Sequence, residues 1–319
     1  MVDRQGHEEE PIAKQGESSQ VEVDGREIAL TNLDKVLWPA AGFTKAQAID
    51  YYARVAETIL PHLRGRPLTR VRFPDGTESQ RFYEKRAPSH TPDWVETAAI
   101  EMGTAGVIDF IVCDDKPTLI WLAQLAALEL HPSLALAADP DRPTVVAFDL
   151  DPGAPASIVE CARIALRLRE LFDRLGVEAF PKTSGSKGLQ IYLPLNGDVD
   201  FDATKDFARA VAQALERSEP ELVVSRQKKE LRKGKVLVDW GQNDRAKTTV
   251  AVYSLRCRER PWVSTPLTWD EVEALAEEGD PEAVRFEAAD VIERIDDHGD
   301  LFAPVLELEQ ALPAAAPAA

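Results

Sequence analysis

The sequence predicts an α+β fold in which mixed or antiparallel sheets are flanked by helices. Three observations support this prediction. Short β-branched runs such as "TVVAFDLDP" and "KVLVDWG" have the composition of buried strands. Longer segments with apolar residues at helical spacing lie between them. The two kinds of segment interleave without the regular β–α–β alternation of a parallel sheet.

Composition places the chain among ordinary globular proteins. Its 319 residues are enough to bury a substantial core, and 44 % of them are apolar. No stretch approaches the roughly 18–20 apolar residues that cross a bilayer, and no apolar signal segment opens the chain. Cys113, Cys161 and Cys257 are far apart, which favours reduced thiols over disulfides or a cysteine zinc site. We therefore expect a cytoplasmic protein without a membrane partner.

The chain divides into one domain and two termini. Residues 1–20 are polar and charged and are expected to form a disordered leader. Residues 21–305 contain no repeat and no low-complexity linker, so one continuous domain is expected. Residues 306–319 close on "LPAAAPAA" and are expected to form a C-terminal tail.

The first half of the domain contains two predicted helices and two short strands. Thr44 is a candidate N-cap for a helix whose apolar stripe runs from Ile49 to Ile59. "PLTRVRFP" and "RFYEKRA" are read as strands around the turn "PDGTES". "PTLIWLAQLAALELHPSLA" is strongly apolar and is read as a helix that ends near His131 and Pro132.

The second half alternates strands and helices. "TVVAFDLDP" is a strand, and residues 157–176 form a helix with Ser157 as its cap and Gly176 as its stop. "VEAFPK", "TSGSKG" and "LQIYLPL" form a strand–turn–strand unit, followed by a helix at about residues 203–217. The strand "KVLVDWG" comes after a basic stretch.

Two aspartates end the strand "VVAFDLDPG". Residues i and i+2 of a strand face the same side, so Asp149 and Asp151 can converge on one site. A divalent cation would relieve their repulsion, and Asp239, at the end of "KVLVD", is the candidate third carboxylate of a two-metal site. A turn-capping pair remains an alternative. So does the D-x-D strand of the haloacid-dehalogenase phosphatases, although Gly153 stands where that motif has Thr or Val.

The turn "TSGSKG" consists of small residues between two strands. Its backbone N–H groups can approach an anion closely, while Ser184 adds a hydroxyl and Lys187 adds charge. It lacks Walker A spacing, so it reads as a triphosphate clamp or an ordinary polar hairpin. His131 alone would more often be a capping residue than a catalytic one. Arg256 and Arg258 indicate phosphate contact or plain ion pairs.

Charge is unevenly distributed along the chain. The net charge of −18 argues against general nucleic-acid binding, which depends on Lys and Arg. The stretch "RQKKELRKGK" nevertheless concentrates six cations within ten residues, 226–235. This stretch is either a solvated loop or the wall of a locally basic channel.

Taken together, these stretches resemble the polymerase domain of bacterial ligase D, in the archaeo-eukaryotic primase superfamily. The resemblance covers about residues 21–305 and rests on motifs that occur in the family's order. They are "LTNLDKVLWP", "FTKAQAIDYY", "RFPDG", "RFYEKRAP", "LELHPSLA", "VVAFDLDPG", "KTSGSKGL", "VLVDWGQN" and "YSLRCRERPWVSTPL".

The resemblance implies a primase-polymerase catalytic core and a set of site residues. Asp149, Asp151 and Asp239 would bind two divalent ions, manganese or magnesium, for nucleotidyl transfer to a primer 3′-hydroxyl. The nucleotide would be held by His131, Ser184, Lys187, Gln190, Gln242 and Arg256, with Phe82 and Tyr83 stacking on the nascent base pair and Arg72 near the triphosphate. Asn32, Lys35 and Lys45 match a pocket for the 5′-phosphate of a gapped or broken DNA end.

Gln190 departs from the family pattern, which commonly has His at this position. Glutamine donates a hydrogen bond but carries no charge, so the departure bears on nucleotide affinity or rate. The motifs end near residue 305, and a stand-alone polymerase that recruits a separate ATP-dependent DNA ligase and Ku is expected.

We therefore expect a template-directed polymerase that extends primers at short gaps and DNA ends in end joining, with primer-template DNA and NTP or dNTP as partners and a preference for ribonucleotides. A metal-dependent phosphoryl hydrolase and a non-catalytic DNA-end-binding adaptor are the alternatives.

Overall fold

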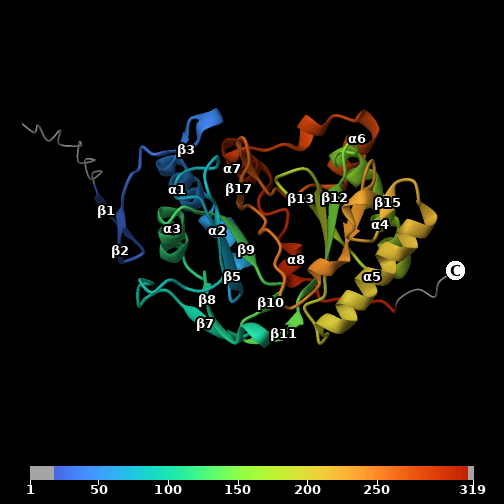
Figure 1. Ribbon diagram of the computed structural model, residues 1–319, viewed down its shortest axis with the longest axis horizontal. Helices are drawn as coiled ribbons and strands as arrows, with labels where there is room; N and C mark the ends of the chain where they lie inside the picture. The colour runs from blue at the N-terminus through green and yellow to red at the C-terminus, as the bar shows by residue number, and fades with distance from the viewer. Residues whose placement is uncertain (1–17, 315–319) are drawn as a thin grey trace, which may run out of the picture.

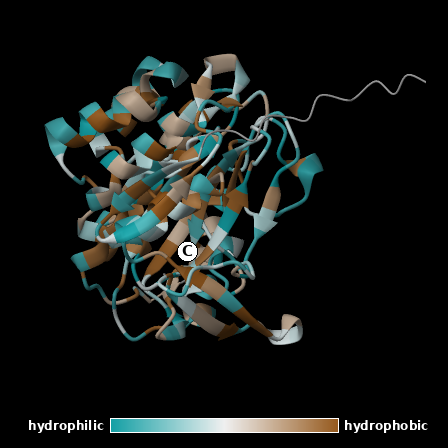
Figure 2. Cartoon of the chain, turned by 90° about the vertical axis from the view of Figure 1, so that its left-hand side faces the viewer, coloured by the Kyte–Doolittle hydropathy of each residue, from teal (hydrophilic) through white to brown (hydrophobic). Residues whose placement is uncertain are grey.

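Two five-stranded sheets, one in each half of the molecule, form the framework of the computed structural model, which describes residues 18–314 (Figure 1). Each sheet has its own cluster of buried side chains. The cartoon coloured by hydropathy shows apolar residues concentrated in the central strands and polar residues in the outer turns (Figure 2). The mixed, largely antiparallel α+β class predicted from the sequence is confirmed.

The first sheet is built around β5, which pairs with β6, β8 and β9, while β7 pairs with β8. All of these pairings are antiparallel. Four helices belong to this half. The elements are β5 (Pro67–Arg72), β6 (Phe82–Glu84), β7 (Thr97–Glu101), β8 (Val107–Val112), β9 (Ala127–Pro132), α1 (Lys45–Arg54), α2 (Ala56–Leu63), α3 (Lys116–Gln124) and α7 (Ala288–His298).

The second sheet has the strand order β13-β14-β12-β16-β15. Its neighbours are antiparallel except for β15 and β16, which are parallel. Helices α4, α5 and α6 lie in the same half (Figure 1). The elements are β12 (Val145–Pro152), β13 (Phe180–Thr183), β14 (Leu189–Pro194), β15 (Val223–Val224), β16 (Val236–Asp239), α4 (Ile158–Leu175), α5 (Phe201–Ser218) and α6 (Trp269–Glu278).

Four two-stranded hairpins and several short helices complete the described chain. The hairpins pair β1 with β2, β3 with β4, β10 with β11, and β17 with β18. Their bounds are β1 (Ser19–Val23), β2 (Arg26–Leu30), β3 (Val36–Trp38), β4 (Phe43–Thr44), β10 (Ala135–Leu136), β11 (Asp139–Pro143), β17 (Leu255–Cys257) and β18 (Pro261–Val263). The short helices are α8 (Pro304–Glu307) and the 3₁₀ turns η1 (Pro39–Ala41), η2 (Gly103–Ala105), η3 (Lys229–Leu231), η4 (Trp240–Gln242) and η5 (Pro281–Val284).

Helix ends follow the sequence signals closely. Thr44 caps α1 in a capping box with Gln47, and Ser157 caps α4 in a second one with Glu160. Gly176 ends α4 in the left-handed conformation, with φ of 72°. These three predictions are confirmed. The single helix expected after Thr44 is, however, two helices, because α1 ends at Arg54 and α2 begins after Val55.

The helix predicted to reach His131 is wrong in its second half. Helix α3 ends at Gln124, Ala126 adopts a positive φ of 54°, and the chain continues as strand β9. Strand β9 pairs with β5 over most of its length, with His131 opposite Thr69. Pairing with a distant strand therefore overrode the helical pattern of the apolar run.

The folded chain extends past both expected domain boundaries. Ser19 and Gln20 already belong to β1. In the expected tail, the backbone N–H of Gln310 donates to the carbonyl of Leu195 (3.0 Å). Most of the expected leader, residues 1–17, and the end of the tail, residues 315–319, lie outside the described residues. Within residues 18–314, no helix is long and apolar enough to cross a membrane.

Candidate active site

Strand β12 presents its two aspartates on the face away from the helices. Phe148 and Leu150 are fully buried, and the ring of Phe148 packs against the rings of Phe172 in α4 (5.5 Å between centroids) and Phe207 in α5 (6.5 Å). Because side chains alternate along a strand, this packing turns Asp149 and Asp151 to the opposite face. The same alternation that the sequence showed therefore places both carboxylates at one site.

Asp239 lies directly opposite Asp149 in the pairing of β16 with β12. Its Oδ1 accepts the backbone N–H of Gly241 (2.9 Å), and its Oδ2 accepts Nε2 of Gln242 (3.1 Å). The next residue, Asn243, is fully buried and bonds the backbone of Ala147 in β12 with both its amide oxygen and its amide nitrogen. Asn243 thereby anchors the turn after β16 against the strand that carries Asp149.

The three carboxylates are crowded but are not arranged as a closed ligand set. Among residues 18–314, no group of three or more His, Cys, Asp or Glu side chains is gathered closely enough to hold a metal ion. Asp151 instead forms ion pairs with Lys187 (2.9 Å) and Arg232 (3.3 Å). Burial and the charges of Asp239 and Asp151 raise the pKa of Asp149 to about 6, against the opposing effect of the Gln190 hydrogen bond. A set of oxygen donors that repel one another in this way fits a hard divalent cation.

The "TSGSKG" turn connects β13 and β14 and depends on its glycines. Gly185 has a φ of 62°, and a Cβ there would meet the Arg256 side chain at 2.5 Å. A Cβ on Gly188 would meet the carbonyl oxygen of Leu150 at 2.0 Å. Ser184 closes the turn, because its N–H donates to the carbonyl of Gly188 (2.9 Å). The small residues therefore allow this turn to lie directly against β12.

A cleft of about 290 Å³ lies between the turn, the aspartates and the segment after β16. Six of the nine residues expected to hold the nucleotide line it. They are His131, Ser184, Lys187, Gln190, Gln242 and Arg256. Arg258 also lines the cleft, and its Nε donates to Oγ of Ser186 (2.9 Å). The lining of the cleft thus combines the carboxylates of Asp149 and Asp151 with cations and hydroxyls, while Asp239 lies outside the lining.

Glu129 connects His131 with the two arginines of the cleft. It is 4 % exposed, and its carboxylate contacts Nε2 of His131 (3.1 Å), Nε of Arg256 (3.6 Å) and Nη1 of Arg258 (3.9 Å). Burial raises the pKa of Glu129, but the His131 hydrogen bond and the charge of Arg256 outweigh it and bring the pKa down to about 2. Burial, with the charges of Arg256 and Lys182, lowers the pKa of His131. Glu129 therefore stays ionised as the shared counter-charge of this cluster.

The expected base-stacking residues lie on the exposed strand β6. Phe82 is 40 % and Tyr83 is 59 % exposed. The Tyr83 ring lies 6.5 Å from the His131 ring, and its hydroxyl lies 3.2 Å from Oγ1 of Thr248, a residue of the cleft. Tyr83 thus stands beside the cleft with its ring largely open to solvent, and Phe82, the preceding residue of β6, is also exposed.

Arg72 is not among the residues that line this cleft. Its Nε donates to the carbonyl of Leu125 (2.8 Å), and its Nη1 pairs with Glu84 (3.0 Å). It lies instead on the side of β5 that faces Lys45, whose pKa its charge helps to lower. The placement of Arg72 near the triphosphate stays a prediction.

Asn32, Lys35 and Lys45 come together at the entry to α1. Lys35 pairs with Asp75 (2.7 Å), and its carbonyl accepts the backbone N–H of Lys45 (2.8 Å). Lys45 is 6 % exposed, and its Nζ donates to the carbonyl of Thr31 (2.8 Å). Burial and the charges of Lys35 and Arg72 lower the pKa of Lys45 to about 8. Lys35 and Lys45 thus lie, with Arg72, in a group of cations separate from the aspartates.

Sequence reasoning missed two buried residues of the site, Glu129 and Lys182. Glu129 and His131 alternate in "ELH", which would place them on one strand face, but the segment was read as a helix. Lys182 immediately precedes the "TSGSKG" turn and is fully buried. Its position opposite Gln190 follows from strand register, which the local sequence does not display.

Comparisons with known proteins agree with this geometry. Residues 44–302 match the family described as the LigD primase-polymerase domain. The multifunctional non-homologous end joining protein LigD of Mycolicibacterium smegmatis is 42 % identical over 280 residues, which are 87 % of this chain and 36 % of that protein. The bifunctional LigD of Bacillus subtilis is 32 % identical over 248 residues, 77 % of this chain and 40 % of that protein. The chain thus spans about two fifths or less of the length of these relatives.

A solved structure shows the same fold. The polymerase domain of Mycobacterium tuberculosis ligase D, in complex with DNA, matches with a TM-score of 0.81 and 40 % sequence identity. The match covers 89 % of this chain and 99 % of that one. With the family match over most of the chain and the aspartates opposed beside the "TSGSKG" turn, the chain belongs to the LigD primase-polymerase domain family.

Proposed function

We propose that this chain is a template-directed nucleotidyltransferase that extends primers at short gaps and DNA ends in non-homologous end joining. One observation carries the proposal. Asp149 and Asp239 oppose each other on neighbouring strands, beside a cleft lined by Lys187, Arg256 and Arg258. Carboxylates next to a triphosphate-sized basic cleft suit nucleotidyl transfer, because both the ions and the polyphosphate have complementary charges there.

Asp149, Asp151 and Asp239 would hold two divalent ions, Mn²⁺ or Mg²⁺. When bound, such ions activate the attacking 3′-hydroxyl and stabilise the charge on the phosphates. The chain's own residues orient the partners. Lys187 and Arg256 would hold the triphosphate by charge-assisted hydrogen bonds, with Ser184, His131 and Gln242 beside them. Phe82 and Tyr83 would stack on the nascent base pair.

The pocket of Asn32, Lys35 and Lys45 would receive the downstream 5′-phosphate of a gap. Lys45 supports this role, because it is buried with only a backbone carbonyl as its hydrogen-bond acceptor and with two other cations close by. A dianionic phosphate would supply Lys45 with the anionic partner that it lacks and would compete with Asp75 for Lys35. DNA as a partner is supported by the DNA complex of the Mycobacterium tuberculosis domain. Ku and a DNA ligase are proposed as protein partners.

Extension of a labelled primer across a one-nucleotide gap tests the proposal. With Mn²⁺ and a 5′-phosphorylated downstream strand, we expect addition of the nucleotide that pairs with the template. Faster addition with NTPs than with dNTPs is expected for a ribonucleotide-preferring polymerase. Release of pyrophosphate or phosphate from the nucleotide without primer growth would instead favour a phosphoryl hydrolase, and binding of ends without either reaction would favour an adaptor.

A further inference from the structure

Four polar side chains form a row across the second sheet. Strand register places Lys182 of β13 opposite Gln190 of β14, Gln190 opposite Asp149 of β12, and Asp149 opposite Asp239 of β16. Directly opposite residues of antiparallel strands face the same side of a sheet. Lys182 is fully buried and Gln190 is 5 % exposed, so the row leads from the interior to the aspartates of the cleft.

Hydrogen bonds connect the first three members of this row in one direction. Nζ of Lys182 donates to Oε1 of Gln190 (2.6 Å), and Nε2 of Gln190 donates to Oδ1 of Asp149 (3.1 Å). Nζ of Lys182 faces the carbonyl oxygen of Gln190, and the carboxylate of Asp149 offers only acceptors to the amide NH₂ group. The amide of Gln190 is therefore left with a single orientation, in which its NH₂ group faces Asp149.

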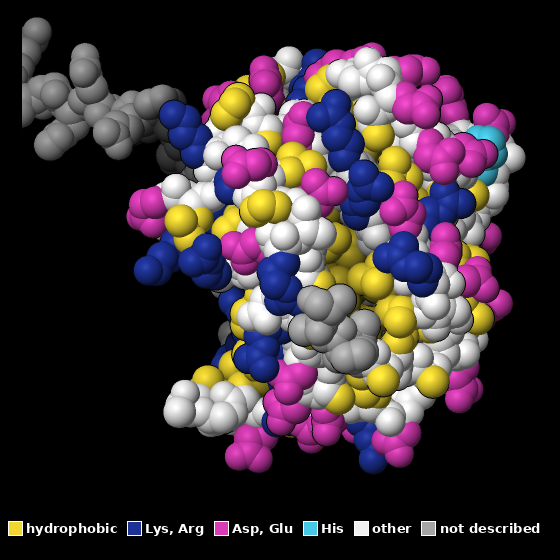
Figure 3. Space-filling model, turned by 90° about the vertical axis from the view of Figure 1, so that its right-hand side faces the viewer, with side chains coloured by type: hydrophobic (Ala, Val, Ile, Leu, Met, Phe, Trp, Pro, Cys, Tyr) yellow, Lys and Arg dark blue, Asp and Glu magenta, His cyan; other side chains and the backbone are white. Residues whose placement is uncertain are grey.

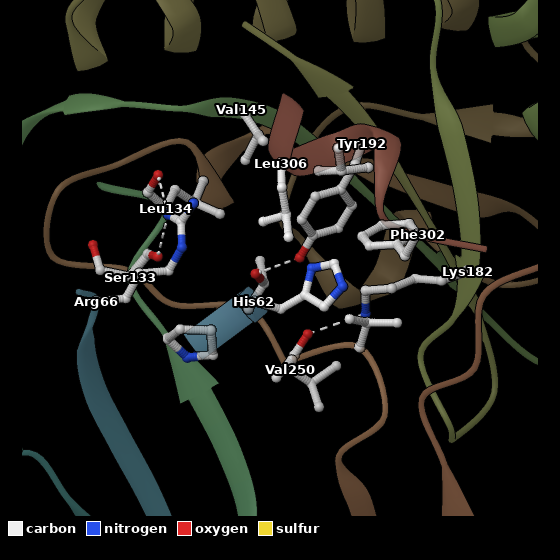
Figure 4. A pocket seen from close by; sticks show the side chains of 15 residues that line it. His62, Arg66, Ser133, Leu134, Val145, Lys182, Tyr192, Val250, Phe302 and Leu306 are labelled. Carbon is white, nitrogen blue, oxygen red and sulfur yellow. Dashed lines mark hydrogen bonds between the residues drawn. The ribbon is translucent and has the colours of Figure 1, made fainter. Parts of the chain in front are cut away.

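Lys182 is held by neutral acceptors alone. Its other partners are Oγ of Ser264 (2.7 Å) and the carbonyl oxygen of Val250 (3.0 Å). The close-up in Figure 4 shows Lys182 bonded to Val250 at a small pocket of about 40 Å³, near His62 and Tyr192. Burial and the charge of Arg256 lower the pKa of Lys182 well below that of an exposed lysine. Burying an amino group is costly, and packing alone would be served by an apolar side chain of the same length.

We propose that Lys182 is a positioning residue for the metal site: by fixing the amide of Gln190, it holds the carboxylate of Asp149 in the orientation that receives the ion. This inference rests on the proposed role of Asp149 as a metal ligand. Partners behind metal ligands commonly contribute about 10–100-fold to metal affinity. Lys182 acts only through Gln190, so the two residues form one unit.

Mn²⁺ binding to the full chain, measured by the electron paramagnetic resonance signal of free Mn²⁺, tests this unit without nucleotide or DNA. Lys182→Met keeps the length of the side chain and removes its donors, while Gln190→Met removes the relay. Each should weaken the tightest Mn²⁺ site about tenfold. The double variant should be no weaker than Gln190→Met alone, because the effects of residues in one chain of contacts do not add.

Two further variants separate positioning from packing. Ser264→Ala removes another partner of Lys182 but leaves the bond to Gln190, and it should keep Mn²⁺ affinity within about twofold of wild type. Gln190→His should retain most of the affinity, because a neutral imidazole can accept from Lys182 and donate to Asp149. If Lys182→Met does not fold, the contrast between Gln190→His and Gln190→Met carries the test.

The outcomes separate this inference from the proposed function. Three results would overturn the positioning role. Lys182→Met could bind Mn²⁺ as tightly as wild type, or Gln190→His and Gln190→Met could lose Mn²⁺ affinity equally. The third result is a loss of Mn²⁺ affinity in the double variant that multiplies to about a hundredfold. A lower thermal midpoint with unchanged Mn²⁺ affinity would show a packing role only. If Asp149→Asn binds Mn²⁺ as tightly as wild type, the metal site of the proposed function fails as well.

Discussion

The carboxyl group of Asp149 is buried beside two other carboxylates, and its pKa is raised to about 6. An acid whose pKa rises on folding binds protons more tightly in the folded state, so its contribution to stability becomes less favourable as pH rises from about 4 to 6. Without metal, Asp149→Asn should therefore be more stable than wild type at pH 8, by about 1–3 kcal/mol. The advantage should shrink as pH falls through 6 towards 4.

Thermal unfolding in EDTA at several pH values measures this effect. The same variant should be inactive in primer extension, since a neutral amide lacks the negative charge with which a carboxylate holds a divalent cation. A stability difference that does not vary between pH 4 and 8 would mean that Asp149 is not strained by its neighbours.

Glu129 is the shared counter-charge of Arg256 and Arg258 and a hydrogen-bond partner of His131. Glu129→Gln leaves buried cations unpaired, which typically costs about 3–5 kcal/mol. A bound triphosphate would supply the missing negative charge, so NTP should raise the thermal midpoint of Glu129→Gln more than that of wild type.

The control is Glu170→Gln, which breaks the exposed pair of Glu170 with Arg167. That variant should change stability by less than about 1 kcal/mol, with or without NTP. An equal NTP-induced shift in Glu129→Gln and wild type would contradict a link between Glu129 and the nucleotide cleft.

The "TSGSKG" turn is the element that sets the depth of the cleft. Gly188→Ala would place a methyl group 2.0 Å from the carbonyl oxygen of Leu150, so β12 and the turn must separate. We expect a loss of about 1–3 kcal/mol of stability and a weaker affinity for nucleotide. Gly197→Ala is the matched control, because its Cβ would meet the carbonyl oxygen of Leu195 at 3.5 Å, an ordinary contact. Chemical denaturation and nucleotide titration of both variants measure the difference; equal behaviour would show that the close approach is not required.

Lys45, at the start of α1, has a charge that should change within an accessible pH range. Protonated Lys45 is needed to bind a phosphate, and its pKa of about 8 lies far below that of an exposed lysine. Preference for 5′-phosphorylated over 5′-hydroxyl gaps should therefore fall about tenfold between pH 7 and pH 9. Lys45→Arg keeps its charge over this range and should flatten the pH dependence. Fluorescence anisotropy measures the affinities for the two gapped duplexes, and their ratio gives the preference. If this ratio does not change with pH in wild type, Lys45 does not bind the 5′-phosphate.

Elements differed in how well the sequence predicted them. Caps such as Thr44 and Ser157 were predictable because their hydrogen bonds reach only two or three residues along the chain. Strand β9 was not, because its pairing with β5 joins segments about 60 residues apart in the sequence. The same limit applies to the site. The sequence identified Asp149 and Asp239 as strand ends, but their direct opposition, and that of Gln190 and Lys182, depends on register.

The molecule as a whole places the cleft where its two halves meet. His131 comes from the first sheet, whereas Asp149 and Ser184 come from the second and its turn. The segment after β16 joins them, since the N–H of Ala251 donates to Leu130 of β9 (2.9 Å) and the carbonyl of Val250 accepts Nζ of Lys182 in β13. Both sheets must therefore be folded and correctly placed for the cleft to exist.

The overall charge of −18 is compatible with DNA binding because cations are concentrated locally. On the face that carries α4 and α5, acidic and basic side chains are interspersed (Figure 3). The cleft and the start of α1, by contrast, gather Lys187, Arg256, Lys35 and Lys45. A negative net charge limits non-specific association with DNA, while locally gathered cations attract phosphates.

The central claim is that the chain is a template-directed nucleotidyltransferase. The most direct test measures insertion of a single nucleotide opposite each of the four template bases, in a 5′-phosphorylated one-nucleotide gap with Mn²⁺. The account predicts that wild type inserts the complementary nucleotide, that Asp239→Asn lowers insertion by at least about a thousandfold, and that the exposed Asp173→Asn inserts like wild type. Insertion by Asp239→Asn at the wild-type rate, or insertion that ignores the template base, would contradict it.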